Sequence, residues 1–240
     1  MENGILRGEL MKKAFTLSEV LVTLGIIAVV AALTIPSIVS NYKNRVLGAQ
    51  IEKVYGQISD AVRLITSDEL TTNFSKTTGG VAQTYSSGNC ATGACYFLKN
   101  YFKVAKDNCK DANEATGVES CLADTYFYKN PTTGAIGDAG NIKNHATYCI
   151  QTVSSATICI AFNGANGVST VFVDTNGRDE PNMVGYDAYL FDIRNNDGTL
   201  RDWKEDGAQC GTQSNSFGFV ADYAQGCLSK VIQNGWVVTD

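Results

Sequence analysis

The first residue that could do chemistry is Glu19, because it is the only charged side chain between Phe15 and Ile35. A carboxylate in hydrocarbon costs on the order of 2 to 3 kcal/mol or more, so it needs a partner. A cut between Ala14 and Phe15 would create an amino group four residues before Glu19. A neighbouring copy could offer that amine to Glu19, which would neutralise both charges and set the stagger between subunits. The spacing therefore predicts self-assembly.

The segment that must position Glu19 is the apolar run from Phe15 to Ile35, which follows Lys12 and Lys13. About 20 mostly apolar residues are enough to cross a bilayer as a helix. Paired lysines before the run, with no basic cluster immediately after it, place the N-terminus in the cytoplasm. Pro36 tends to kink a membrane helix rather than end it, so the helix is expected to resume.

These residues resemble the processing and assembly signature of type IV pilins and type II secretion pseudopilins. The resemblance is specific from Lys12 to about Tyr42 and is carried by Lys12, Lys13, Ala14, Phe15, Thr16, Leu17, Ser18, Glu19, the apolar run and Pro36. In that family a membrane peptidase cuts before the Phe and methylates its new amine. The Glu then meets the N-terminus of an adjacent subunit. Ala14 stands where the family usually has Gly.

Two other interpretations of the N-terminus remain open. A secretory signal peptide also has basic residues, an apolar core and a cut after small residues, but it explains neither Glu19 nor a helical pattern beyond Pro36. A plain membrane anchor with an incidental glutamate is the second. Each predicts a mature chain that does not begin at Phe15.

Beyond Pro36, apolar residues recur every three or four positions, which predicts one helix from Phe15 to about Asp68. The recurring residues are Val39, Tyr42, Val46, Val54, Ile58, Ala61, Val62 and Ile65. Such an amphipathic second half suits a helix that leaves lipid and lies against a soluble domain. A coiled coil gives the same pattern, but the stripe covers few heptads.

All eight cysteines lie beyond the apolar run, which indicates an oxidising exterior and disulfides. Eight cysteines allow 105 connectivities. Proximity in the sequence favours Cys90 with Cys95, Cys109 with Cys121, Cys149 with Cys159, and Cys210 with Cys227. Zinc is the alternative use of these thiols, although the chain has no C-x-x-C and a single histidine, His145.

Four short runs read as the strands of an antiparallel meander. They are Thr147–Val153, Ala156–Phe162, Val168–Asp174 and Ala188–Ile193, with a last strand or edge expected from Ser216–Tyr223 and Lys230–Val238. The predicted fold class is α+β: a long N-terminal helix packed on an antiparallel sheet and stapled by disulfides, which is also the pilin-like architecture that the resemblance implies. The expected organisation is a leader at 1–14, the long helix at 15–70 with its transmembrane part at 15–35, and an extracytoplasmic domain at 71–240.

A second place for chemistry is the loop from Asp174 to Asp187, which is rich in the hard oxygen ligands that calcium prefers. The candidate ligands are Asp174, Asn176, Asp179, Glu180 and Asp187. The spacing is not that of an EF-hand, because the fifth position is Arg178 and the twelfth is Gly185. A plain hairpin turned by Asn176 and Gly177 is the alternative. The loop also resembles a motif of pseudopilin-like proteins, several of which bind calcium near this place.

Composition points away from two classes of function. Removing residues 1–14 takes three of 19 basic and two of 24 acidic residues, so the mature chain carries a net charge of about −6. Nucleic-acid binding needs clustered Lys and Arg residues, so we expect no binding of nucleic acid by this acidic chain. No Ser-His-Asp, Cys-His or phosphate-loop pattern is visible, and the adjacent acids Asp179 and Glu180 read as solvated loop. We expect a non-enzyme.

The sequence therefore predicts a structural subunit of a type II secretion pseudopilus or a type IV pilus-like filament. Its expected partners are other copies of itself, related pilin-like subunits, the prepilin peptidase, inner-membrane assembly machinery and the bilayer. It would begin as a single-pass protein of the bacterial inner membrane and end in an extracytoplasmic filament or at the cell surface. The alternatives are a membrane-tethered binding or adhesion module that never polymerises, a DNA-uptake pilin, and a tethered enzyme.

Overall fold

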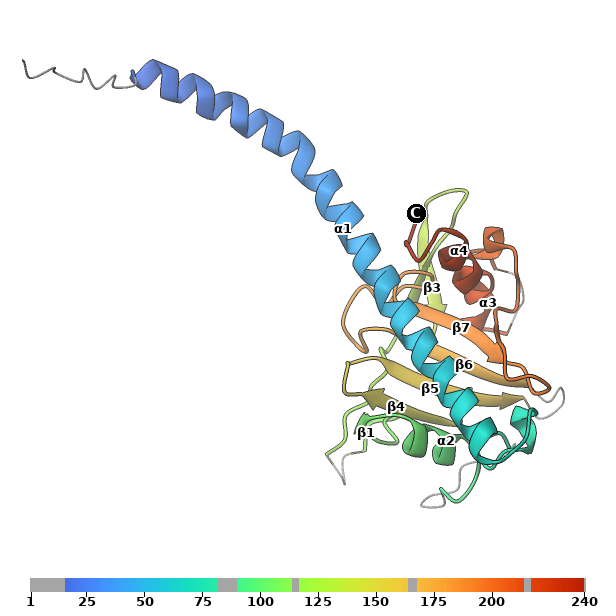
Figure 1. Cartoon of the computed structure of the whole chain (residues 1–240). Coiled ribbons are helices and arrows are strands. Elements are labelled where there is room, and N and C mark those ends of the chain that lie inside the picture. Colours follow the sequence, from blue (N-terminus) through green and yellow to red (C-terminus); the bar gives the residue numbers. More distant parts are fainter. Residues whose placement is uncertain (1–15, 82–89, 114–116, 164–167, 214–216, 240) are drawn as a thin grey trace, which may run out of the picture. The chain divides into compact units, whose positions relative to one another are not determined.

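The computed structural model describes residues 16–81, 90–113, 117–163, 168–213 and 217–239 (Figure 1). The chain divides into two compact units, residues 1–43 and residues 44–240. One long helix, α1 (Leu17–Asp68), runs through both. Among the described residues, the first unit holds only the start of α1, whereas the second holds the rest of that helix, every strand and the remaining helices.

In the first unit α1 is exposed at every position except Ala31, which is half-buried. No side chain from Leu17 to Lys43 is buried, and the large apolar ones, from Leu17 to Tyr42, are 41–78% exposed. By length and composition this helix can cross a membrane. It continues through Pro36 without interruption, as the sequence predicts.

In the second unit α1 is amphipathic and buries one face against the sheet (Figure 1). The buried residues are Gly48, Ile51, Val54, Ile58, Ala61, Val62 and Ile65. Their spacing of three and four keeps them on one side of a helix. The predicted stripe began too early, because Val39, Tyr42 and Val46 are exposed. Since the buried stripe already packs within the chain, a coiled coil is not needed to explain it.

The sheet has six strands in the order β1-β4-β5-β6-β7-β8, and every neighbouring pair is antiparallel. Its strands are β1 (Val104–Lys106), β4 (Tyr148–Thr152), β5 (Thr157–Asn163), β6 (Val168–Asp174), β7 (Ala188–Ile193) and β8 (Leu200–Arg201). The four predicted strands and their meander are therefore confirmed, as β4 to β7. Both edge strands are short, which limits the unpaired backbone that a sheet edge exposes.

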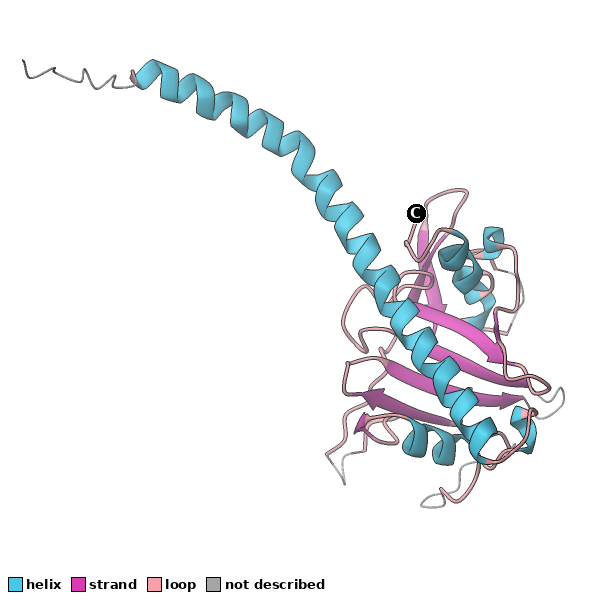
Figure 2. Cartoon of the chain, viewed as in Figure 1, coloured by secondary structure: helices cyan, strands magenta, loops and turns pink. Residues whose placement is uncertain are grey.

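Several smaller elements surround this sheet (Figure 2). They are β2 (Tyr126–Lys129), its partner β3 (Ile136–Gly140), the helices α2 (Gly93–Tyr101), α3 (Ala221–Ala224) and α4 (Cys227–Gln233), and the short 3-10 turns η1 (Phe74–Lys76) and η2 (Gly207–Gln209). The predicted C-terminal strands are wrong, because α3 and α4 occupy that part of the chain. The buried carboxylate of Asp202 accepts hydrogen bonds from Gly226 N (2.8 Å) and Ser229 N (2.9 Å) and so caps α4 from a distance.

The eight cysteines form four disulfides, the same four that proximity in the sequence favours. Cys149 and Cys159 are directly opposite each other on β4 and β5, with Cα atoms 4.1 Å apart. This matches the closely spaced type of antiparallel pair, in which facing side chains approach nearest. Cys210 and Cys227 join the end of η2 to the start of α4.

The C-terminal segment crosses α1 where the helix has no side chain. A Cβ added to Gly48 would lie 1.9 Å from the backbone oxygen of Trp236. Nearby, Val238 N donates to Asn44 O at 3.3 Å, and the ring of Tyr55 lies 5.5 Å from that of Trp236 and 6.1 Å from that of Phe191. Glycine at position 48 therefore lets the end of the chain close over the helix.

We expect Gly48→Ala to destabilise the domain by about 1 to 3 kcal/mol, because neither backbone can move away without breaking its own contacts. Gly56→Ala is the matched control on the same helix, where an added Cβ meets nothing within 4 Å. It should stabilise by up to about 1 kcal/mol through helix propensity. Urea unfolding of the full chain in detergent measures both, and equal shifts in the two variants would contradict the close approach.

Candidate functional site

Glu19 lies in the first turn of α1 and is bonded to Thr16, just before the helix. Its Oε2 accepts from Thr16 N at 2.8 Å and from Thr16 Oγ1 at 2.9 Å, while Glu19 N donates to Thr16 Oγ1 at 3.2 Å. This reciprocal pair is a capping box, which satisfies amide groups that the first turn of a helix leaves without partners. The Thr-x-x-Glu spacing is the signal in the sequence from which this cap could have been predicted.

Of the other residues predicted for cleavage, methylation and assembly, only Pro36 is described by the structure. Ala14 and Phe15 lie outside the described residues, so cleavage and methylation between them stay predictions. Pro36 lies inside α1. The predicted need of Glu19 for a partner is met in part within its own chain, by Thr16.

The acidic loop is closed by the pairing of two strands. Asp174 ends β6 and Asp187 immediately precedes β7, and the register pairs Asp174 with Ala188. Thr175 N also donates to the backbone oxygen of Asp187 at 2.9 Å. The fold therefore brings both ends of the loop together, and the side chains of Asp174 and Asp187 are fully buried.

Asp174 is held by two donors from different segments. Its Oδ2 accepts from the hydroxyl of Tyr126 at 2.8 Å, and its Oδ1 accepts from Asn176 N at 3.3 Å. Burial, followed by the charge of Asp187, raises the pKa of Asp174 to about 8, although the hydrogen bonds from Tyr126 and the backbone oppose the shift. The sequence gives no local signal for Tyr126, which lies 48 residues before its partner.

Asp187 organises the second half of the loop. Its Oδ1 accepts from Met183 N at 2.6 Å and its Oδ2 from Asn182 N at 2.8 Å. Burial raises the pKa of Asp187 to about 6, against the effect of those two amide donors. Both carboxyl groups therefore hold the loop together while their charged forms are disfavoured.

The five candidate calcium ligands do not all converge. Asp174, Asn176 and Asp187 lie together, since Asn176 is bonded to both carboxyl groups. Asp179 and Glu180 are exposed, and only their backbone oxygens join the loop, by accepting from Asn176 Nδ2 at 3.0 and 3.1 Å. No group of three or more His, Cys, Asp or Glu residues suited to a metal occurs in the described parts of the chain.

The three residues that lie together, Asp174, Asn176 and Asp187, nevertheless have surroundings that would suit a hard cation. Within this loop, Thr175 Oγ1, Asn176 Oδ1 and Asn182 Oδ1 are buried and have no hydrogen-bond partner. Hard cations bind carboxylate and amide oxygens, and a cation would relieve the repulsion between Asp174 and Asp187. Asp174, Asn176 and Asp187 are therefore the residues that would hold calcium, and calcium binding stays a prediction.

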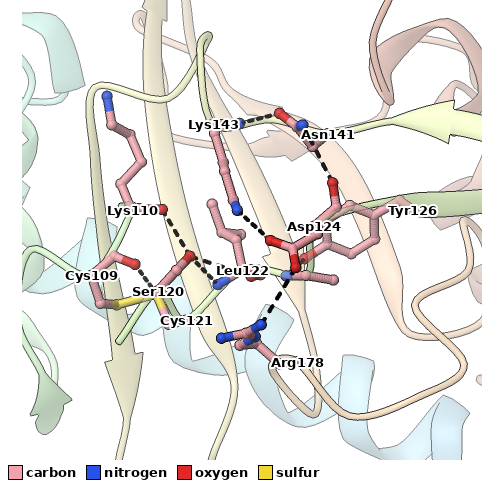
Figure 3. Close-up of polar contacts among 11 residues, drawn as sticks. Cys109, Lys110, Ser120, Cys121, Leu122, Asp124, Tyr126, Asn141, Lys143 and Arg178 are labelled. Atoms are coloured by element: carbon pink, nitrogen blue, oxygen red, sulfur yellow. Dashed lines mark hydrogen bonds and ion pairs between the residues drawn. A yellow bond between two sulfur atoms is a disulfide. The ribbon is translucent and has the colours of Figure 1, made fainter. Parts of the chain in front are cut away.

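An ion-pair cluster ties the outside of the loop to the segment before β2 (Figure 3). Asp124 pairs with Lys143 at 2.8 Å and with Arg178, from the loop, at 3.6 Å. The hydrogen bond and charge of Lys143, followed by the charge of Arg178, hold the pKa of the Asp124 carboxyl below its usual range. Exposed pairs of this kind add little stability. The buried bond from Tyr126 to Asp174 is the stronger link between these segments.

His145 is on the surface, where its ring stacks on Phe219 with centroids 3.7 Å apart and planes at 12°. The two rings come from separate segments of the chain.

Comparison of the chain with protein-family models, with characterised proteins and with solved structures found no match in any of the three. What the chain does therefore has to be inferred from its own residues and geometry.

The two buried aspartates predict how stability depends on pH. Their pKa values of about 8 and about 6 exceed the value of about 3.9 for a free aspartate, so the folded chain holds protons that the unfolded chain releases. Without calcium, the stability that these two groups contribute should be fully present below about pH 4 and should be lost as the pH rises through about 6 and about 8. Urea unfolding at a series of pH values, in a chelator, measures the slope.

Asp174→Asn should flatten this pH dependence because it removes the group with the higher pKa, whereas Asp179→Asn, at an exposed position of the same loop, should keep it. A slope that is the same in Asp174→Asn and in the unmodified chain would show that Asp174 does not cause it.

A separate prediction concerns calcium binding at pH 8. At that pH an added cation would offset the repulsion between the carboxylates of Asp174 and Asp187 and so stabilise the folded chain. Calcium should raise the thermal midpoint of the unmodified chain and of Asp179→Asn equally, and a chelator should reverse the rise. Asp187→Asn should lose the response. If calcium moves no midpoint, hydrogen bonds alone account for the loop.

Proposed function

We propose that this protein is the structural subunit of a pilus-like filament, assembled through the first half of α1. The observation that carries the proposal is an exposed apolar helix, Leu17 to Tyr42, whose only charged side chain is Glu19. Because the described chain offers that surface no partner, it suits lipid first and the corresponding helices of other copies afterwards. Glu19 then pairs with the amine of Phe15 in another copy and sets the register.

The proposal implies an order of events for the subunit. The chain is inserted into the inner membrane with its N-terminus in the cytoplasm. The prepilin peptidase cuts before Phe15 and methylates the new amine. Assembly machinery then draws the helix out of the bilayer into the filament core, with the disulfide-bonded α+β domain outside. The four disulfides and the membrane-length helix support this order, since they belong to an oxidising exterior and a bilayer respectively.

The role that we favour for the filament is type II secretion, in which a pseudopilus pushes folded proteins outward. A surface pilus for adhesion or motility uses the same assembly chemistry. DNA uptake fits less well, because the acidic balance of the chain disfavours phosphate contacts.

One observation favours the alternative of a tethered binding module that does not polymerise. A surface groove of about 850 Å3 is formed by the last turns of α1, the residues after them and Asp197. Its lining includes Leu64 and Leu70, which are 54% and 94% exposed, together with charged and hydroxyl side chains. A groove of this mixed character could receive a ligand without any filament.

The two functions differ in their dependence on Glu19. We expect Glu19→Ala to insert into the membrane normally, because it removes a charge from the apolar helix, but to be lost from filaments by at least tenfold. Glu52→Ala is the matched control, an exposed glutamate on the same helix inside the second unit. Quantifying subunits in the sheared filament fraction and in the membrane gives the comparison.

The intact mass of the membrane protein gives the second half of this test. A chain that begins with N-methylated Phe15 is expected. A chain that keeps residues 1–14, together with normal behaviour of Glu19→Ala, would overturn the filament and leave the tethered module.

A further inference from the structure

The bonds around Glu19 use only one of its two carboxylate oxygens. Thr16 N and Thr16 Oγ1 both donate to Oε2, at 2.8 and 2.9 Å. Within the described parts of the chain, Oε1 receives no hydrogen bond. One oxygen of Glu19, Oε2, is therefore occupied by Thr16, whereas Oε1 has no donor among the described residues.

This arrangement would survive the proposed cleavage. All three hydrogen bonds join Thr16 to Glu19, and both residues follow the bond between Ala14 and Phe15. Cleavage creates a charged amine at Phe15 and leaves the amide and hydroxyl of Thr16 intact. A mature subunit therefore keeps the hydrogen bonds from Thr16 to the Glu19 carboxylate. It also gains the Phe15 amine with which the Glu19 of a second copy would pair.

The apolar surroundings of Glu19 make its hydrogen bonds to Thr16 more important. Its neighbours Leu17, Val20 and Leu21 are exposed apolar side chains, 41–78% accessible, on a helix suited to lipid. In hydrocarbon no water can replace a missing hydrogen bond to a carboxylate. A glutamate without Thr16 would turn its long side chain toward any donor in reach, so its direction would no longer be fixed.

We propose that Thr16 is the positioning residue of subunit assembly: it holds Oε2 of Glu19 and thereby presents Oε1 to the amine of another copy. This role rests on the proposed filament function. It adds a second residue to the assembly site and gives the Thr16 hydroxyl a use beyond starting the helix.

Substitutions at Thr16 separate positioning from helix capping. Thr16→Val removes the hydroxyl and keeps the shape, and it should lower the fraction of cleaved subunits found in filaments by about tenfold. Thr16→Ser restores the hydroxyl and should assemble within about twofold of the unmodified chain. Thr16→Gly also lacks the hydroxyl, yet glycine is a tolerable residue at a helix start, so it should fail like Thr16→Val.

Thr23→Val is the control for loss of a hydroxyl elsewhere on the helix. Thr23 Oγ1 donates to Val20 O at 3.0 Å rather than to Glu19, so this variant should assemble normally. Each variant is measured in the full chain, with cleavage checked by mass and membrane level by immunoblot. Only cleaved subunits are counted.

Three results would overturn the proposal. Normal assembly of Thr16→Val would show that the hydroxyl is not needed, and normal assembly of Thr16→Gly alone would reduce Thr16 to a helix cap. Loss of cleavage in Thr16→Val and Thr16→Gly would place Thr16 in peptidase recognition instead. Failure of the filament function itself is distinguishable, because Glu19→Ala would then behave like the unmodified chain.

Discussion

The structure depends on one helix whose two halves have different surfaces. The first half of α1 exposes apolar side chains on every face, whereas the second half buries a single face against the sheet. Ile51, Ile58 and Ile65, each about two turns from the next, are completely buried, and each such side chain contributes about 1.5 to 3 kcal/mol when removed from water. The sheet, the C-terminal segment and the disulfide-bonded loops are arranged around that face. The proposed function uses the other half, where none of the described side chains of the helix is buried.

The two candidate sites meet the same physical difficulty in different ways. Both place carboxylates among apolar groups, at Glu19 on a helix that by length and composition could span a membrane and at Asp174 and Asp187 in the buried loop. At Glu19 one neighbouring threonine supplies two donors. In the loop, backbone amides and the hydroxyl of Tyr126 supply the donors, and the mutual repulsion of Asp174 and Asp187 remains. The first arrangement leaves an oxygen open to another chain, and the second leaves oxygens open to a cation.

Local patterns predicted much of this fold. The period of α1, the strands β4 to β7 and the pairing of Cys149 with Cys159 could all be predicted, because each depends on residues close in the sequence. The α4 helix was missed although Cys227, Leu228 and Val231 have helical spacing, since its cap, Asp202, lies more than 20 residues away. The β2–β3 pair was missed because Ile136–Gly140 has little strand character and is held by its pairing with β2. Of the candidate site, Asp174 and Asp187 were named from composition, whereas Tyr126 could be found only through the fold.

The disulfides are all local, with sequence separations of 5 to 17 residues, and none includes a residue before Cys90. No disulfide therefore links α1 to the sheet. If tension enters the subunit through α1, the helix can peel from the domain without breaking a bond between sulfur atoms. The segments enclosed by the disulfides would stay folded back and add no length. Non-covalent packing of the α1 face alone thus sets the force at which the subunit first yields, while the cross-links limit how far it can then extend.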